Sequence, residues 1–212
     1  EYRNSLRVVK QDVVAQNQCI VKLQRFSDTF VFYSKMQGEQ KELFLSPMQN
    51  YLGATAMIMI FFLHSGHPLR GAICFGTGWE IKENDFYGYS LARAHHLEEK
   101  DADYPRLIID NDLYDILQRE ATRENPPSEF IRKTAKECLR LCTKDQDGRI
   151  ILDYLGEYMA EGLKSYNNYT NHASMVRQSY LWILKQLEIY KTEKQLYSKY
   201  EKLKRYFDSR MS

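Results

Sequence analysis

The sequence has no long hydrophobic run and no excess of one charge sign. Its longest apolar stretch, residues 52–63, is about twelve residues long, whereas a membrane-spanning helix needs roughly 20. Thirty basic residues face twenty-eight acidic ones, and neither sign forms a block that would act as a polyanion-binding arm. We therefore expect a buried core helix in place of a membrane segment, and no nucleic acid among the partners.

Cysteine is scarce as well. The chain has Cys19, Cys74, Cys138 and Cys142, and only the last two are close in sequence, with no histidine beside them to complete a zinc site. No signal peptide is visible, although the chain opens at Glu1 without a methionine. These features predict reduced, mostly buried thiols in a cytoplasmic protein.

The apolar residues and turn signals predict one α/β domain with a helical extension. Hydrophobic residues make up 43% of the 212, enough for a sizeable core. We expect a helix end over 2–15, strands over 19–23, 29–34, 69–75, 79–82 and 106–109, and helices over 47–64 and 88–100, with a short helix capped by 110–112 and running to 117. Ser46 would be the N-cap of the helix over 47–64, with Pro47 in its first turn.

Helix signals dominate from Ser128 onward, so we divide the chain into 1–127, a catalytic-type domain, and 128–212, a mainly helical extension. Residues 145–154 interrupt the helices. They match part of a calcium-binding EF-hand loop, but Thr143 and Tyr154 stand where calcium needs carboxylates, so we predict a tight Asp-Gly turn between strands. The amphipathic tail, 173–207, predicts one helix or two that pack on the protein's own core or on a partner subunit.

Asp28 is the most informative single residue. It lies within the apolar and β-branched stretch 26–34, where an ionised side chain is costly unless a cation or hydrogen-bond donors compensate it. One explanation is that backbone amides cap the carboxylate at a strand end. The other is that Asp28 is an oxygen ligand for Mg²⁺ or Mn²⁺, ions that take carboxylates together with substrate phosphates.

Four segments in order resemble the catalytic domain of class III nucleotidyl cyclases. They are FSDTF at 26–30, LRGAI at 69–73 followed by Gly76, DFYGYSLARAHHLE at 85–98 and PRLIID at 105–110. Within that family, the chain is most similar to the pyrimidine nucleotide cyclases of bacterial Pycsar antiphage systems. The supporting pieces include Ser27-Asp28, Tyr87-Gly88, Tyr104-Pro105-Arg106, Asp147-Gly148-Arg149, Asp153-Tyr154-Leu155 and Lys199–Leu203.

The resemblance implies a ferredoxin-type α+β sheet and a metal-dependent lyase. Such an enzyme converts a nucleoside triphosphate, here UTP or CTP, to a 3′,5′-cyclic nucleotide and pyrophosphate. It works as a homodimer with composite sites between subunits, and a separate effector reads the product. Two carboxylates hold Mg²⁺ or Mn²⁺ in the family, and Asp28 matches the second. The first has no counterpart here, so we expect it on a strand upstream of Glu1.

The resemblance also assigns residues to the nucleotide. Asp85 stands where the family has a base-selecting acid, although a plain turn residue is an equal explanation. Gln24 stands where adenylyl cyclases have a purine-contacting lysine, and an amide suits a pyrimidine edge because it both donates and accepts. Ser27 and Arg70 are the other nucleotide-binding candidates.

The transition-state residues of the family are replaced in this chain. Where the family has an Asn, this chain has Ala92, whose side chain cannot hydrogen-bond. Where the family has an Arg, this chain has His96, which is a weak cation near neutral pH. Arg93 or Arg70 can supply the positive charge, or each is a structural arginine, and His96 is either catalytic or a packed imidazole.

The sequence is therefore compatible with three functions. The first is a pyrimidine nucleotide cyclase with Asp28, Arg93 and His96 as catalytic residues. The second, favoured by Ala92 and by the missing first aspartate, is a catalytically inactive cyclase-homology module that binds a nucleotide or a partner protein. The third is a purely structural helical interaction protein based on the tail.

Overall fold

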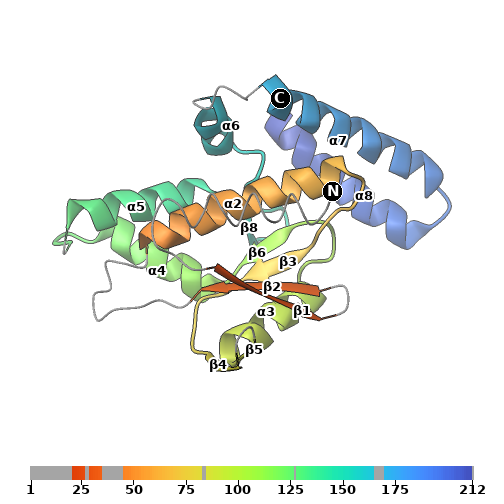
Figure 1. Cartoon of the computed structure of the whole chain (residues 1–212). Coiled ribbons are helices and arrows are strands. Elements are labelled where there is room, and N and C mark those ends of the chain that lie inside the picture. Colours follow the sequence, from red (N-terminus) through yellow and green to blue (C-terminus); the bar gives the residue numbers. More distant parts are fainter. Residues whose placement is uncertain are drawn as a thin grey trace.

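The computed structural model describes residues 21–26, 29–34, 45–82, 85–126, 128–164 and 170–211. Within these residues the chain forms seven helices and three small sheets, so the predicted mixed α/β class is confirmed. Figure 1 shows helices surrounding a central group of short strands. The more specific cyclase-type ferredoxin sheet remains a prediction.

The central sheet has four strands in the order β3 (Gly71–Ile73), β6 (Leu107–Ile109), β8 (Ile150–Leu152) and β7 (Cys142–Lys144). Strands β3 and β6 are parallel, while the other two pairs are antiparallel. All three residues of β6 are buried, which matches its unbroken apolar sequence. The predicted Asp-Gly turn joins β7 to β8, and Gly148 supplies the positive φ that such a turn needs.

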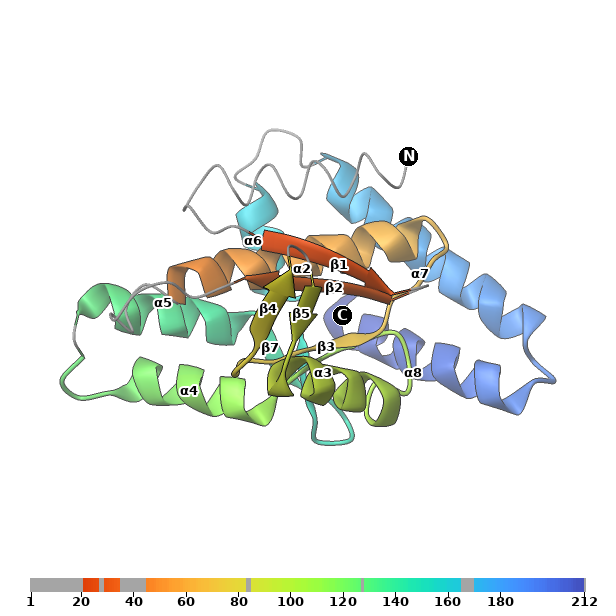
Figure 2. The same cartoon turned by 60° about the horizontal axis from the view of Figure 1, so that its bottom comes forward.

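The other strands that the structure describes form two separate two-stranded ribbons. Strands β1 (Val21–Phe26) and β2 (Thr29–Ser34) form one antiparallel pair, and β4 (Trp79–Lys82) and β5 (Asp85–Tyr87) form the other. Figure 2 shows the β4–β5 ribbon reaching toward the β1–β2 ribbon. A ribbon of two strands is marginally stable alone, so each depends on its neighbours.

The helices that the structure describes pack around these strands. They are α2 (Leu45–His64), α3 (Tyr89–Lys100), α4 (Asn111–Thr122), α5 (Glu129–Arg140), α6 (Glu157–Lys164), α7 (Thr170–Ile189) and α8 (Lys194–Met211). Helix α3 packs on β3 and β6, α2 packs on α5 and α7, and the pairs α4–α5 and α7–α8 flank the molecule on opposite sides (Figures 1 and 2). Within the described ranges, no helix is long and apolar enough to cross a bilayer.

Most predicted elements are confirmed, and the differences follow from packing. Helix α4 runs five residues past the predicted end at 117, because Leu117 and Ala121 continue its buried face. Helix α2 begins at Leu45, so Ser46 lies inside it and the predicted N-cap is wrong. Strand β3 is shorter than predicted, since the chain leaves the sheet after Ile73. The helix end predicted over 2–15 lies outside the described residues.

The tail forms a helical hairpin that packs on the protein's own core. Ile183 of α7 and Leu203 and Phe207 of α8 are completely buried. Near the end of α8, the Tyr206 hydroxyl donates to Asp153 Oδ1 over 2.9 Å, and Arg210 Nε donates to the same oxygen over 3.0 Å. These bonds tie helix α8 to the segment that follows β8.

A buried arginine fastens the β7–β8 turn to the segment that precedes β6. Arg106, whose side chain is 3% exposed, pairs with Asp145 and with Asp147, the latter over 2.6 Å. It also donates to the Asp101 carbonyl over 2.5 Å, and its guanidinium lies over the Tyr104 ring. Removing the cation would leave the Asp145 carboxylate, which is 12% exposed, without its counter-ion.

We predict that Arg106→Leu lowers the free energy of unfolding by about 3 kcal/mol, because the largely buried Asp145 loses its counter-ion. Urea denaturation at pH 7 measures this change. Arg119→Leu is the matched control, since that side chain is 69% exposed and pairs only on the surface with Glu120. A loss below 1 kcal/mol for Arg106→Leu would contradict the role of this ion pair.

Candidate functional site

The β1–β2 ribbon presents three neighbouring polar side chains on one face. Lys22 and Tyr33 are direct register partners across the two strands. Gln24 lies two residues after Lys22 and therefore points to the same side. This face receives the β4–β5 ribbon.

Glu80 of β4 joins the two ribbons. Its Oε1 accepts a hydrogen bond from Lys22 Nζ over 2.6 Å and one from the Tyr33 hydroxyl over 2.8 Å. Beside it, the Tyr33 ring stacks on Phe86 of β5 with 4.6 Å between the centroids. The Glu80 side chain is only 7% exposed, so its charge is held by these two donors and not by water.

Gln24 and Asp85, two of the predicted nucleotide-binding residues, are in direct contact. Gln24 Nε2 donates to Asp85 Oδ1 over 3.2 Å, and the Phe86 backbone N–H donates to Gln24 Oε1 over 3.0 Å. Asp85 is the first residue of β5. The Tyr87 hydroxyl donates to the Asp85 carboxylate, and this bond raises the pKa of Tyr87. Four polar groups therefore converge at the junction of the ribbons.

Arg93 of α3 is held by a buried aspartate. Its Nε and Nη2 donate to Asp110 Oδ1 over 2.9 and 2.8 Å, and Asp110 is 1% exposed at the end of β6. The bond to Asp110 raises the pKa of Arg93, so the guanidinium stays charged. Asp110 is the N-cap residue of α4, but its side chain makes no capping bond because it binds Arg93. The pair holds α3 on β6.

The three cysteines that the structure describes are free thiols, as predicted. Burial, followed by the charge of Asp110, raises the pKa of Cys74 to about 12. Burial likewise raises the pKa of Cys138 and of Cys142 to about 12. These groups remain protonated at neutral pH, which excludes them as nucleophiles. Cys19 lies outside the described residues.

Arg70, Arg93 and His96 take no part in the contacts described above between the two ribbons. Arg70 pairs with Glu98 over 2.7 Å near the end of α3, so it also fastens this helix. His96 is exposed, as is Ala92 one turn earlier, and these two share a face that Arg93 does not. The catalytic and nucleotide-binding roles assigned to Arg70, Arg93 and His96 stay predictions.

The predicted metal site cannot be located on the described residues. Ser27 and Asp28 form the connection between β1 and β2 and lie outside those residues. Among the residues that the structure does describe, no group of three His, Cys, Asp or Glu side chains could hold a metal ion. The carboxylates nearest the candidate site, Glu80 and Asp85, are already used by protein donors. The described residues alone therefore do not fit Mg²⁺ or Mn²⁺.

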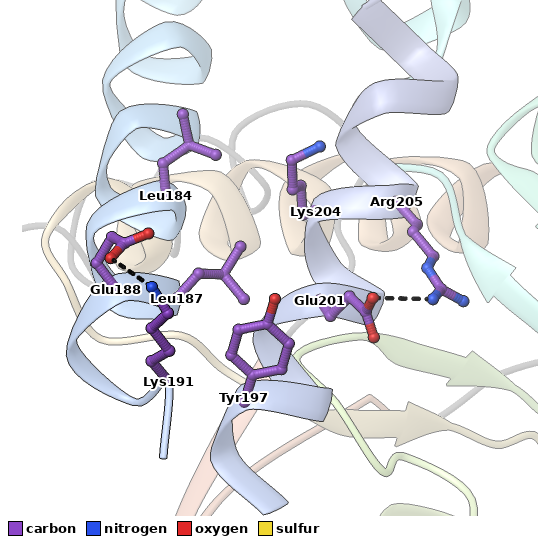
Figure 3. A pocket seen from close by; sticks show the side chains of 8 residues that line it. All are labelled: Leu184, Leu187, Glu188, Lys191, Tyr197, Glu201, Lys204 and Arg205. Carbon is purple, nitrogen blue, oxygen red and sulfur yellow. Dashed lines mark ion pairs between the residues drawn. The ribbon is translucent and has the colours of Figure 1, made fainter. Parts of the chain in front are cut away.

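A cavity of about 650 Å³ lies elsewhere, between α7 and α8 (Figure 3). Leu184, Leu187 and Tyr197 form its apolar part. Two charged pairs line its rim, Lys191 with Glu188 and Arg205 with Glu201. These charges are paired within the protein.

Comparison with known proteins does not assign the chain to a family. No family model matches the chain. No curated protein and no solved structure matches it either. The proposed function is therefore based on the chain's own residues.

Sequence reasoning missed Lys22, Tyr33 and Glu80, which hold the two ribbons together. One signal was present: Lys22 and Gln24 are polar residues two apart in a strand, which places both on one face. It also treated Asp110 only as a helix cap. The acid follows a fully buried apolar strand, a position where a nearby cation is required.

We predict that Arg93→Met lowers the free energy of unfolding by about 2 kcal/mol, because the buried Asp110 carboxylate loses its cation. Adding Asp110→Asn removes that charge and should restore more than half of the loss. Urea denaturation of the single and double variants measures both effects. If the double variant is no more stable than Arg93→Met, the ion pair is not what holds α3 on β6.

Proposed function

We propose that this protein is a nucleotidyl cyclase that converts UTP or CTP to a 3′,5′-cyclic nucleotide and pyrophosphate. One observation carries the proposal. Gln24 and Asp85, which the resemblance assigns to the nucleotide base, are 61 residues apart in sequence and share a hydrogen bond. The contact places the two candidate base-binding residues side by side, which supports the assignment.

The reaction is an in-line displacement at phosphorus. The ribose 3′-oxygen forms a bond to the α-phosphorus, the bond from that phosphorus to the β-phosphate oxygen breaks, the hydroxyl proton passes to a base, and pyrophosphate leaves. A bound Mg²⁺ or Mn²⁺ would supply charge compensation, and Asp28 is the residue proposed to hold it.

The chain's own residues divide the remaining work. Gln24 and Asp85 would orient the base, with the ribbon junction keeping both in place. His96, exposed on α3, is available to the phosphates when protonated. Arg93 is bound to Asp110, and its side chain is about 31% exposed. Its positive charge would therefore act on the nucleotide only through that exposed part.

The proposal includes a homodimer, and the outer face of the β4–β5 ribbon is the surface we assign to it. Trp79 and Ile81 are 67% and 69% exposed, and Tyr87, the register partner of Trp79, is 46% exposed. Together they expose on the order of 400 Å² of mainly apolar surface, about half of what each partner of a standard interface buries. A subunit placed there would lie beside Gln24 and Asp85.

We predict that Trp79→Ser weakens dimerisation at least ten-fold, since it removes the largest exposed side chain of this face. Sedimentation velocity over a concentration series measures the dissociation constant. Ile189→Ser, on α7, removes an apolar side chain that is 55% exposed and serves as the control. A dimer that dissociates with Ile189→Ser and persists with Trp79→Ser would place the interface on the helical tail.

The product would act as a signal for a separate effector in bacterial antiphage defence, as in the systems that this chain resembles. The second candidate, an inactive cyclase-homology module, is supported by Ala92, which is exposed and cannot hydrogen-bond where the family uses an Asn. Turnover separates these two functions.

The decisive test is incubation of the native full-length protein with each of the four nucleoside triphosphates and Mn²⁺. We expect a cyclic pyrimidine nucleotide and pyrophosphate, identified by mass spectrometry. Asp28→Ala should reduce turnover at least 100-fold without changing the unfolding midpoint, because it removes a proposed metal ligand. Asp115→Ala, an exposed acid on α4, is the control and should keep full activity.

Two results would count against the cyclase. Unchanged product formation by Asp28→Ala would remove this residue from the metal site. Nucleotide binding without any cyclic product from the native protein would favour the inactive module.

A further inference from the structure

Aromatic pairs set the distance between helices α7 and α8. Tyr190 stacks on Tyr200, with 5.7 Å between the ring centroids and 5° between the ring planes. The Trp182 ring meets the same Tyr200 ring edge-on at 5.6 Å, and Tyr180 stacks on Phe207 at 6.1 Å. Because these rings are close-packed, the two helices cannot move closer without overlap of the rings.

The cavity of about 650 Å³ occupies space that this packing leaves between the helices (Figure 3). Leu184 and Leu187 line it from α7, and Tyr197 lines it from α8. The fixed distance between the helices keeps these three side chains from closing the gap. The cavity is therefore preformed, and its volume lies within the range of about 300–1,000 Å³ that is typical of small-molecule sites.

The surface around the cavity is positively charged. Residues 185–211 carry eight basic and four acidic side chains. Lys202 and Arg210 pair with Asp103 and Asp153 outside this segment, which leaves six basic side chains against the four acids. A surface with this balance attracts an anion and repels a cation.

The ion pairs at the rim of the cavity are weak. Lys191 Nζ lies 3.9 Å from the Glu188 carboxylate, and both side chains are largely exposed. Arg205 pairs with Glu201 over 3.0 Å, and these side chains are about half exposed. Exposed pairs of this kind contribute little free energy, so a bound anion can share their cations at low cost.

Tyr197 adds a flat ring to the apolar part of the lining. The residue is 36% exposed, and Figure 3 shows it between Leu187 of α7 and Glu201 of its own helix. Lys204 lines the same cavity two turns further along α8. We propose that the cavity binds a small organic anion whose aromatic body packs on Tyr197 and Leu187 and whose charged group lies beside Lys204. Binding at this site does not require the proposed cyclase activity.

The test is a fluorescence titration of the native full-length protein with anilinonaphthalene sulfonate, an aromatic body with one negative charge. The matched probe phenylnaphthylamine has the same rings and no sulfonate. We expect one saturable site for the anion. The dissociation constant of the neutral probe should be at least ten-fold higher, because it has no charged group to bind Lys204.

Variants locate the site. Tyr197→Ser should weaken the anionic probe at least ten-fold, because it removes the ring on which the probe packs. Phe130→Ser, on α5, removes a ring that is 58% exposed and should leave the affinity unchanged. Lys204→Gln should weaken binding about five-fold. Lys199→Gln removes the same charge from the same helix outside the cavity lining, and should change the affinity less than about two-fold.

Three results would overturn the inference. The first is fluorescence that does not saturate, and the second is equal affinity for the anionic and neutral probes. The third is an effect of Tyr197→Ser no larger than that of Phe130→Ser. If Tyr197→Ser does not fold, the two lysine variants decide: equal effects of Lys204→Gln and Lys199→Gln contradict the site, and a larger effect of Lys204→Gln supports it.

Discussion

The contact between the two ribbons is the interaction on which the candidate site depends. Neither ribbon has enough surface to be stable by itself, and each reaches the other through few side chains. A buried Glu80 carboxylate shared by Lys22 and Tyr33 fixes how they meet. Polar contacts of this kind specify position more than they add stability, because misplacing either ribbon would leave a buried charge without donors. Gln24 and Asp85 are brought together as a consequence.

The sequence predicted the local elements well, because each depends on nearby residues. The β1–β2 pair, the buried helix α2 and the Asp-Gly turn at Gly148 all follow from alternation, apolar spacing and turn chemistry. It did not predict that Asp110 binds Arg93, because the two lie 17 residues apart and the contact depends on how α3 packs on the sheet. The same limit applies to Glu80, whose donors come from strands more than 40 residues earlier.

Residues from both halves of the chain share one core, which bears on the predicted division at 127. Strand β8 pairs with β6, so the helical extension completes the sheet of the first part. The ion pairs of Arg106 with Asp145 and Asp147 then tie that extension to the segment before β6. Helix α3, which carries Arg93 and His96, is positioned by Arg70, just before β3, and by Asp110, just after β6.

The central claim is that the junction of the two ribbons binds a pyrimidine nucleotide through Gln24. Nuclear magnetic resonance of the ¹⁵N-labelled side-chain amides, recorded during titration with 3′-deoxy-UTP, tests it directly. The account predicts a saturable shift of the Gln24 Nε2 resonances, and no shift for Gln118, an exposed amide on α4. Nucleotide binding that leaves the Gln24 resonances unchanged would contradict it.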